Sequence, residues 1–218
     1  MVEAVPAQTS DQIKEICIGL AEKHLAAKDS YKVLKDEADK SIWQGKEEGT
    51  PCTVGVFEAE GLTMEDFREF YNRDNWCANM KLLDKNITAE ILDVDMGEGM
   101  AMYQHIKTPM VVSNRCVFSV NFCIDLEGGG MIQISTSKGM EKIIEQSAAK
   151  IGKDVLSTTI FSYIKFEPKA TGGVTITAVI CVDPAGSIPD FVKDKIAAAN
   201  SDTTIKMIAH LRKKKGLK

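Results

Sequence analysis

A change in periodicity along the chain constrains its fold more than any other sequence feature. Between Leu82 and Ser137, apolar residues recur at every second position, which is the period of a β-strand. Glycine-rich breaks at 97–99 and 128–130 divide this region into short segments, as an antiparallel meander requires. The expected strands are 87–95, 100–107, 115–125 and 131–136, followed by 158–167 and 175–182 with a hairpin loop at 168–173.

Segments of helical period flank and interrupt this meander. Ser10 and Thr63 are natural N-caps for two helices, because their hydroxyls can accept a hydrogen bond from the first turn. Pro189 fits the first turn of a long C-terminal helix, where a backbone N–H is not needed. Strand–helix–strand alternation is absent from the sequence pattern, so we predict an α+β fold with an antiparallel sheet. The expected helices are 11–28, 64–71, 139–151 and 187–215, and the remaining strands are a short one at 31–42 and one at 52–58.

The last helix is the one large apolar element left to cover the curved face of such a meander. Several of its residues are small, namely Ala197, Ala198, Ala199 and Ala209. Small side chains between a sheet and a helix leave room for an internal apolar cavity. The alternative is ordinary close packing of the same elements. In either case we expect a single domain over residues 1–218.

Composition and charge exclude several classes of protein. The formal net charge of −4 lacks the basic footprint of a general nucleic-acid binder. Apolar runs such as 176–181 are far too short to span a bilayer. The first ten residues contain no basic stretch followed by an apolar one, so no secretory signal is expected. Six cysteines are scattered without a C-x-x-C pair, which favours free thiols and a cytoplasmic protein.

The sequence carries no recognisable catalytic or cofactor motif. His24, His105 and His210 are too widely separated to indicate a metal site. The patterns G-x-S-x-G, H-E-x-x-H and the phosphate-binding glycine loops are absent. We therefore expect a protein that is not an enzyme and that needs neither a metal nor a cofactor.

Three segments match one known family in order and spacing. They are 178–192 (AVICVDPAGSIPDFV), 112–118 (VSNRCVF) and 71–76 (YNRDNW), the last followed by Leu82-Leu83-Asp84. Together they resemble START domains, the lipid-transfer modules related to the steroidogenic acute regulatory protein. The resemblance covers residues 10–215 and implies the helix-grip fold, in which a long curved antiparallel sheet wraps around a C-terminal lid helix. It also implies non-catalytic binding and intermembrane transfer of one lipid or sterol molecule.

Arg115 is the first candidate for a ligand contact. A guanidinium on a strand of an apolar sheet must be paired or solvated, because burying an isolated charge is very costly. Its planar fork could bind a lipid phosphate or hydroxyl. The alternative is a structural arginine tied to a carboxylate such as Asp93 or Asp95.

Four further residues are candidates for lining the cavity. Some START domains place a charged pair on the cavity floor, and the resemblance puts Met102 and Asn121 at those positions. Both are uncharged, which implies a less polar cavity in which Asn121 could bond a hydroxyl or carbonyl. Strand alternation places Gln104 on the same face as Met102. Ala198 on the last helix would face the ligand, and ordinary packing roles remain the alternative for all four.

The basic tail at 212–218 could hold the domain transiently against an anionic membrane, or could be a solvated helix end.

Two other functions stay open beside the carrier function. One is an enzyme of the wider helix-grip superfamily, for which Glu90, Asp93, His105 and Arg115 would be the acid–base candidates. The other is a lipid-sensing regulatory module. The expected partners are one lipid or sterol ligand and a membrane surface, without nucleic acid, for a monomeric protein.

Overall fold

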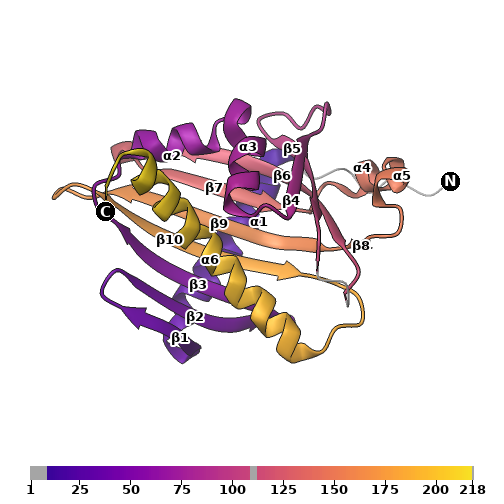
Figure 1. Ribbon diagram of the computed structural model, residues 1–218, viewed down its shortest axis with the longest axis horizontal. Helices are drawn as coiled ribbons and strands as arrows, with labels where there is room; N and C mark the ends of the chain where they lie inside the picture. The colour runs from indigo at the N-terminus through magenta and orange to yellow at the C-terminus, as the bar shows by residue number, and fades with distance from the viewer. Residues whose placement is uncertain (1–8, 109–111, 218) are drawn as a thin grey trace.

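One curved, open sheet organises the structure (Figure 1), a computed structural model that describes residues 9–108 and 112–217. The strands are β1 (Lys32–Glu37), β2 (Lys40–Glu47), β3 (Thr50–Ala59), β4 (Ile87–Ile91), β5 (Met100–Ile106), β6 (Arg115–Asp125), β7 (Met131–Thr136), β8 (Val155–Leu156), β9 (Thr158–Pro168) and β10 (Val174–Asp183). Their order in the sheet is β1-β2-β3-β10-β9-β7-β6-β5-β4, and β8 pairs with β6. The pairs along this path are antiparallel, whereas the short β6–β8 pair is parallel.

Helices cover both faces of this sheet. The helices are α1 (Ser10–Ala27), α2 (Met64–Tyr71), α3 (Arg73–Leu83), α4 (Glu141–Gln146), α5 (Ala148–Ile151) and α6 (Asp190–Lys214), with 3₁₀ turns η1 (Lys28–Ser30) and η2 (Glu127–Gly129). Helix α6 crosses the front of the sheet in Figure 1 and packs on β3 and β10, with α2 and α3 beside it. Helix α1 lies behind the sheet, against β7, β9 and β10. We name the two sides the α6 face and the α1 face.

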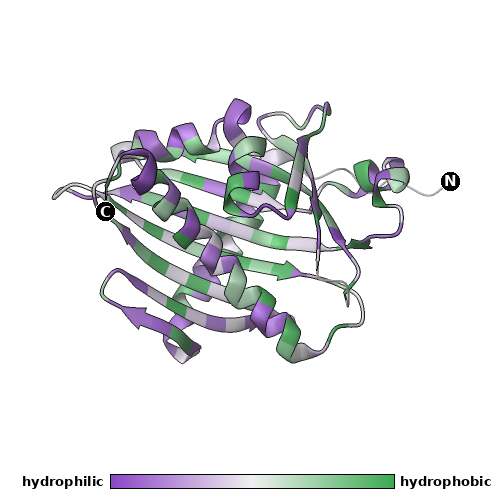
Figure 2. Cartoon of the chain, in the orientation of Figure 1, coloured by the Kyte–Doolittle hydropathy of each residue, from purple (hydrophilic) through white to green (hydrophobic). Residues whose placement is uncertain are grey.

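Each face of the sheet has its own apolar core, and green bands run across the strands in Figure 2. On the α6 face, Phe57, Phe166 and Met207 are fully buried. On the α1 face, Phe118 and Phe161 are fully buried. Burying side chains of this size contributes about 1.5–3 kcal/mol each. The fold is therefore the helix-grip α+β fold, with α6 gripped by one face of the sheet.

Polar side chains anchor α1 to the opposite face. The Nε2–H of the fully buried His24 donates to Oε2 of Glu47 on β2 at 2.8 Å, and the Tyr31 hydroxyl donates to His24 Nδ1 at 2.7 Å. Lys23 also donates to Glu47 at 2.8 Å. Hydrogen bonds from Lys23 and His24 outweigh the effect of burial and hold the pKa of Glu47 below its usual range.

Charge protects the edge of the sheet at β1. Its residues Lys32, Lys35, Asp36 and Glu37 are exposed, and β1 is largely purple in Figure 2. Charged edge strands disfavour pairing with a strand of another chain.

Several expected boundaries were wrong. The segment 31–42, expected as one short strand, contains β1, a turn at Ala38-Asp39 and the start of β2. The turn lacks the glycine or proline that would have marked it. Strand β4 ends at Ile91, four positions before the expected end. The expected helix at 139–151 is two short helices, because Ser147 leaves helical geometry between them. Helix α3 was not expected as an element.

Two expected helix caps are also corrected, and one is confirmed. The N-cap of α1 is Thr9, whose hydroxyl accepts from the Gln12 N–H at 3.3 Å, while the Ser10 hydroxyl donates instead to the carbonyl of Met96 at 3.2 Å. Pro189 is the N-cap of α6 and lies just before its first turn. Thr63 is the N-cap of α2, as predicted.

None of the helices within 9–108 and 112–217 combines the length and apolar character needed to cross a membrane. The stretch 1–8, from which the sequence predicts no secretory signal, lies outside the described residues.

Candidate functional site

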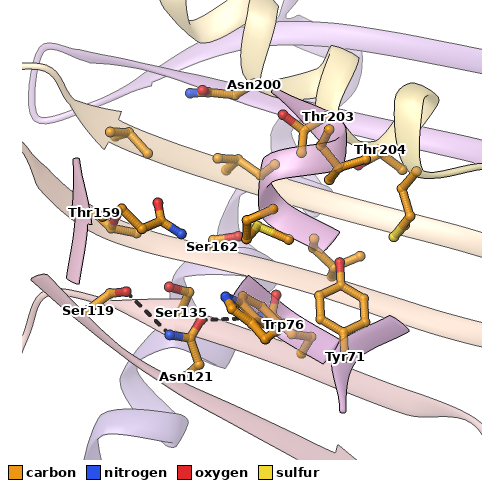
Figure 3. Close-up of a pocket in the computed structure, with 18 residues that line it drawn as sticks. Tyr71, Trp76, Ser119, Asn121, Ser135, Thr159, Ser162, Asn200, Thr203 and Thr204 are labelled. Atoms are coloured by element: carbon orange, nitrogen blue, oxygen red, sulfur yellow. Dashed lines mark hydrogen bonds between the residues drawn. The ribbon is translucent and has the colours of Figure 1, made fainter. Parts of the chain in front are cut away.

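A cavity of about 170 Å³ lies between the α6 face of the sheet and helices α2, α3 and α6 (Figure 3). It lies under the last helix. More than half of the residues around it carry a hydroxyl or carboxamide group. The lining residues are Tyr71, Trp76, Met80, Leu83, Gln104, Ser119, Asn121, Gln133, Ser135, Thr159, Ser162, Ile164, Ile180, Val182, Asn200, Thr203, Thr204 and Met207.

Strands β6 and β7 supply a hydrogen-bonded polar floor. Nε2 of Gln133 donates to Oδ1 of Asn121 at 3.2 Å, and Nδ2 of Asn121 donates to the Ser119 hydroxyl at 3.3 Å (Figure 3). All three residues are buried. Asn121 and Ser119 are two positions apart on β6, so the pleat directs both side chains to the same face. These bonds give the Asn121 carboxamide a partner for its oxygen and a partner for its nitrogen.

Aromatic side chains of α2 and α3 close one side of the cavity. Tyr71 and Trp76 pack with ring centroids 5.1 Å apart, and Trp76 is 4 % exposed. Burial raises the pKa of the Tyr71 phenol, which therefore stays neutral. Asn72 fixes the start of α3, because its side chain accepts from the Asp74 N–H at 2.9 Å. This cap places Trp76 one turn into α3 and over the cavity.

Helix α6 closes the opposite side with polar residues. Asn200, Thr203 and Thr204 reach the cavity from this helix in Figure 3. Two donors at the cavity are buried without a hydrogen-bond partner: Nδ2 of Asn200 and Nε1 of Trp76. A buried donor without a partner is unusual and calls for a specific explanation.

The structure brings two of the five predicted site residues to the cavity. Gln104 and Asn121 line it. Met102 shares the α6 face but is fully buried in the apolar core. Ala198 is half-buried on α6 and is not among the lining residues, whereas its neighbour Ala197 is 2 % exposed.

Arg115, the fifth predicted residue, ties the loop before α6 to the start of β6. Its guanidinium donates to the carbonyls of Pro184 at 3.4 Å, Ala185 at 3.5 Å and Ser113. The expected partners Asp93 and Asp95 are replaced by these backbone carbonyls, because the β10–α6 loop folds over the end of β6. Arg115 is 7 % exposed and does not line the cavity.

Charged side chains are absent from the described lining of the cavity. The acid–base candidates lie elsewhere: His105 Nε2 is 3.0 Å from Asp154, and Glu90 pairs with Lys150 at 2.6 Å. Within the described ranges, no group of three or more His, Cys, Asp or Glu side chains could hold a metal ion. The cavity therefore offers hydrogen bonds and apolar contact without a charged acid–base pair.

The basic tail packs onto α2. Lys214 pairs with Glu69 at 2.9 Å, and Lys215 pairs with Asp66 at 2.8 Å. Arg212 donates to the Glu60 carbonyl at 3.4 Å. These cations are therefore engaged within the chain.

Sequence reasoning missed most of the polar lining. Ser119 could have been found by counting two positions back from Asn121 along the same strand. Trp76, which the sequence marks only as part of the segment 71–76, packs on Tyr71 and lines the cavity. No local sequence pattern marks Asn200 or Gln133 as a lining residue, because their neighbours across the cavity are distant in sequence.

The fold is shared with solved START-domain structures. Human STARD10 superposes with a TM-score of 0.72 at 16% identity, covering 98% of this chain and 83% of that one. Human StAR-related lipid transfer protein 5 gives a TM-score of 0.69 at 15% identity, covering 93% of this chain and 96% of that one. A STAR-related lipid transfer protein from Xanthomonas axonopodis gives 0.65 at 16% identity, covering 84% of this chain and 98% of that one.

The resemblance to START domains is thus confirmed at the level of the fold. At the level of sequence, no protein-family model matches the chain, and no curated protein matches it.

Proposed function

We propose that this chain binds a single lipid or sterol molecule in the cavity under α6 and transfers it between membranes without a catalytic step. The observation that carries the proposal is the cavity itself, which lies between the sheet and the C-terminal helix of a START-like fold. Two of the similar structures are, by name, lipid transfer proteins. Removing the hydrocarbon of a ligand from water contributes about 0.8 kcal/mol per CH₂, so binding needs no covalent step.

The cavity must widen to admit a whole lipid. Its volume of about 170 Å³ is below the roughly 300–1,000 Å³ typical of pockets for drug-sized ligands. The burial of residues along α6 indicates which part of the helix can move most easily to widen the cavity. Between Phe191 and Asn200, only Ala197 is fully buried, whereas Met207, Ile208 and Leu211 are buried in the apolar core farther along. The N-terminal half of α6 is therefore the half that can move away at lower cost.

We further propose that residues 10–215 act as one lipid-binding domain and as a monomer that contacts membranes transiently. A reducing compartment such as the cytoplasm suits its six free thiols. The enzyme alternative receives no support from the site, because Glu90, His105 and Arg115 are engaged outside the cavity.

A transfer assay tests the carrier function. The purified chain is mixed with donor vesicles containing phosphatidylcholine, cholesterol, oleic acid, diacylglycerol or ceramide, and extracted lipid is identified by native mass spectrometry. Ser162→Phe places a large ring in the cavity and should abolish extraction. Ala199→Phe, at an exposed position of α6 outside the lining, is the matched control and should leave extraction unchanged. A chain that extracts no lipid from any vesicle would rule out the carrier function.

A further inference from the structure

The carrier function does not name the ligand, but the unpaired donors of the cavity restrict it. Resting on that proposed function, we propose that the ligand is an uncharged lipid whose polar end presents at least two separate acceptor oxygens, as in a diacylglycerol or a ceramide. A lipid with a phosphate headgroup or with a single hydroxyl does not meet this requirement. The uncharged lining of the cavity and its two buried donors set these limits on the ligand.

The lining disfavours a charged headgroup. Its polar side chains are hydroxyls, carboxamides and the ring N–H and O–H groups of Trp76 and Tyr71. A phosphate carried into such a cavity would lose its hydration without meeting a cation, and burying an unpaired charge is very costly. Arg115 was the candidate for binding phosphate, but its guanidinium donates to carbonyls of the β10–α6 loop. An uncharged polar end avoids this cost.

The polar floor is already satisfied, so it does not set the main requirement on the ligand. Asn121 uses its oxygen for Gln133 and its nitrogen for Ser119. The serine and threonine hydroxyls around it can act as donor or acceptor by rotating. They adapt to a ligand but do not specify one.

The two unpartnered groups are both donors and therefore call for acceptors. Nε1 of Trp76 can only donate, and Nδ2 of Asn200 carries two hydrogens. Leaving either of them unpaired in a complex without water would lower the affinity, because no hydrogen bond would offset the desolvation of the donor. A ligand oxygen at each donor removes that penalty.

The two donors approach the cavity from different sides. Asn200 belongs to α6, and Trp76 belongs to α3 near the sheet, and the two side chains are well separated in Figure 3. One hydroxyl oxygen cannot then serve both. The ester carbonyls of a diacylglycerol, or the amide and hydroxyl oxygens of a ceramide, supply acceptors at more than one position. A sterol with one hydroxyl leaves a donor unpaired.

Competitive binding to the full chain tests the inference. The protein is incubated with vesicles that each contain phosphatidylcholine and one of four additions: dioleoylglycerol, ceramide, cholesterol or phosphatidic acid. Extracted lipid is quantified by mass spectrometry. We expect dioleoylglycerol or ceramide to be extracted in preference to the other lipids. Asn200→Leu removes one donor with little change in shape, and Trp76→Phe removes the other together with part of the indole ring. Each should weaken binding about three- to tenfold.

Trp43 provides a matched control for Trp76. Trp43→Phe changes the other tryptophan, which packs on the α1 face beneath Lys28, and should leave affinity unchanged. Preferred extraction of cholesterol, phosphatidic acid or phosphatidylcholine would overturn the inference and leave the carrier function standing. Unchanged affinity of both donor variants, each shown to be folded by circular dichroism, would assign the donors to bound water and overturn it as well. Extraction of no lipid would overturn the carrier function and the inference together.

Discussion

Asn121 and Gln133 hold each other in place across neighbouring strands, with Nε2 of Gln133 donating to Oδ1 of Asn121 at 3.2 Å in a buried position. This bond fixes the polar floor before any ligand arrives. The floor is thus preorganised, and its contribution to stability can be measured apart from binding.

Removing one carboxamide of this pair should destabilise the fold, because it also leaves the buried partner groups without a hydrogen bond. In Asn121→Leu, the Gln133 amide and the Ser119 hydroxyl lose their partner. We expect the free energy of unfolding to fall by about 1–3 kcal/mol, measured by urea denaturation. Because the partners are coupled, the double variant Asn121→Leu/Gln133→Leu should lose less than the sum of the two single variants. Strict additivity would show that the bond contributes nothing.

Arg115 should act on the β10–α6 loop and only indirectly on binding. Arg115→Met removes the donors that hold the carbonyls of Pro184 and Ala185. We expect a loss of about 1–3 kcal/mol in stability. Hydrogen exchange should quicken at the amides of Ala185 and Ile188, which are bonded within this loop to Asp183 and Gly186. Unchanged exchange at both amides would contradict the anchoring role.

Asp66 should make stability depend on pH in the acid range. Burial would raise its pKa, but hydrogen bonds from Lys215 and from the backbone and hydroxyl of Thr63 outweigh that effect and lower it. A carboxyl whose pKa is lower in the folded state stabilises the fold above its unfolded pKa of about 3.9. That stabilisation is lost as the pH falls through the lower, folded value.

The comparison of Asp66→Asn with the native chain measures this dependence. At neutral pH the variant replaces the carboxylate that accepts from Thr63 and Lys215 with a neutral carboxamide, and we expect it to be less stable by about 0.5–2 kcal/mol. The difference should shrink as the pH falls below about 4. Glu65→Gln, on the same first turn but outside the capping box, is the control. A stability difference that grows on acidification would contradict the assignment.

Thiol labelling should separate the six cysteines by environment. Cys77 on α3 is half-buried, and Cys17, Cys52, Cys116 and Cys181 are buried. Cys123 is at an exposed position of β6, but desolvation of its thiol raises its pKa to about 11. We expect maleimide at pH 8 to modify Cys77 first and Cys123 slowly, because the thiolate is the reactive form. The four buried thiols should react after denaturation; peptide mass spectrometry identifies each site.

The sequence predicted the sheet well because alternation and glycine breaks are local signals. Strands β5, β6, β7, β9 and β10 lie where period two placed them. The β1–β2 hairpin and α3 were missed for a local reason as well. The turn at Ala38-Asp39 lacks glycine and proline, and the polar residues of α3 obscure the spacing of Trp76 and Leu83.

The site was predicted less well, because it is assembled from distant segments. The family resemblance placed Asn121 on the cavity floor, and strand alternation from Met102 added Gln104; both line the cavity. Ala198 was chosen for its size, but the rotation of α6 points its neighbour Ala197 inward instead. Rotation about a helix axis depends on packing across the whole sheet, and a sequence pattern alone does not supply it.

Docking of the basic tail onto α2 determines how the protein should respond to ionic strength. With Lys214 and Lys215 paired to Glu69 and Asp66, and a net charge of −4, we expect weaker attraction to anionic lipid than a free polybasic tail would give. A free polybasic tail would lose its attraction as salt shortens the Debye length to about 8 Å. Here, binding to vesicles that contain phosphatidylserine should stay constant or increase between low and physiological salt in a sedimentation assay. Encounters with membranes would then depend on apolar contact more than on charge.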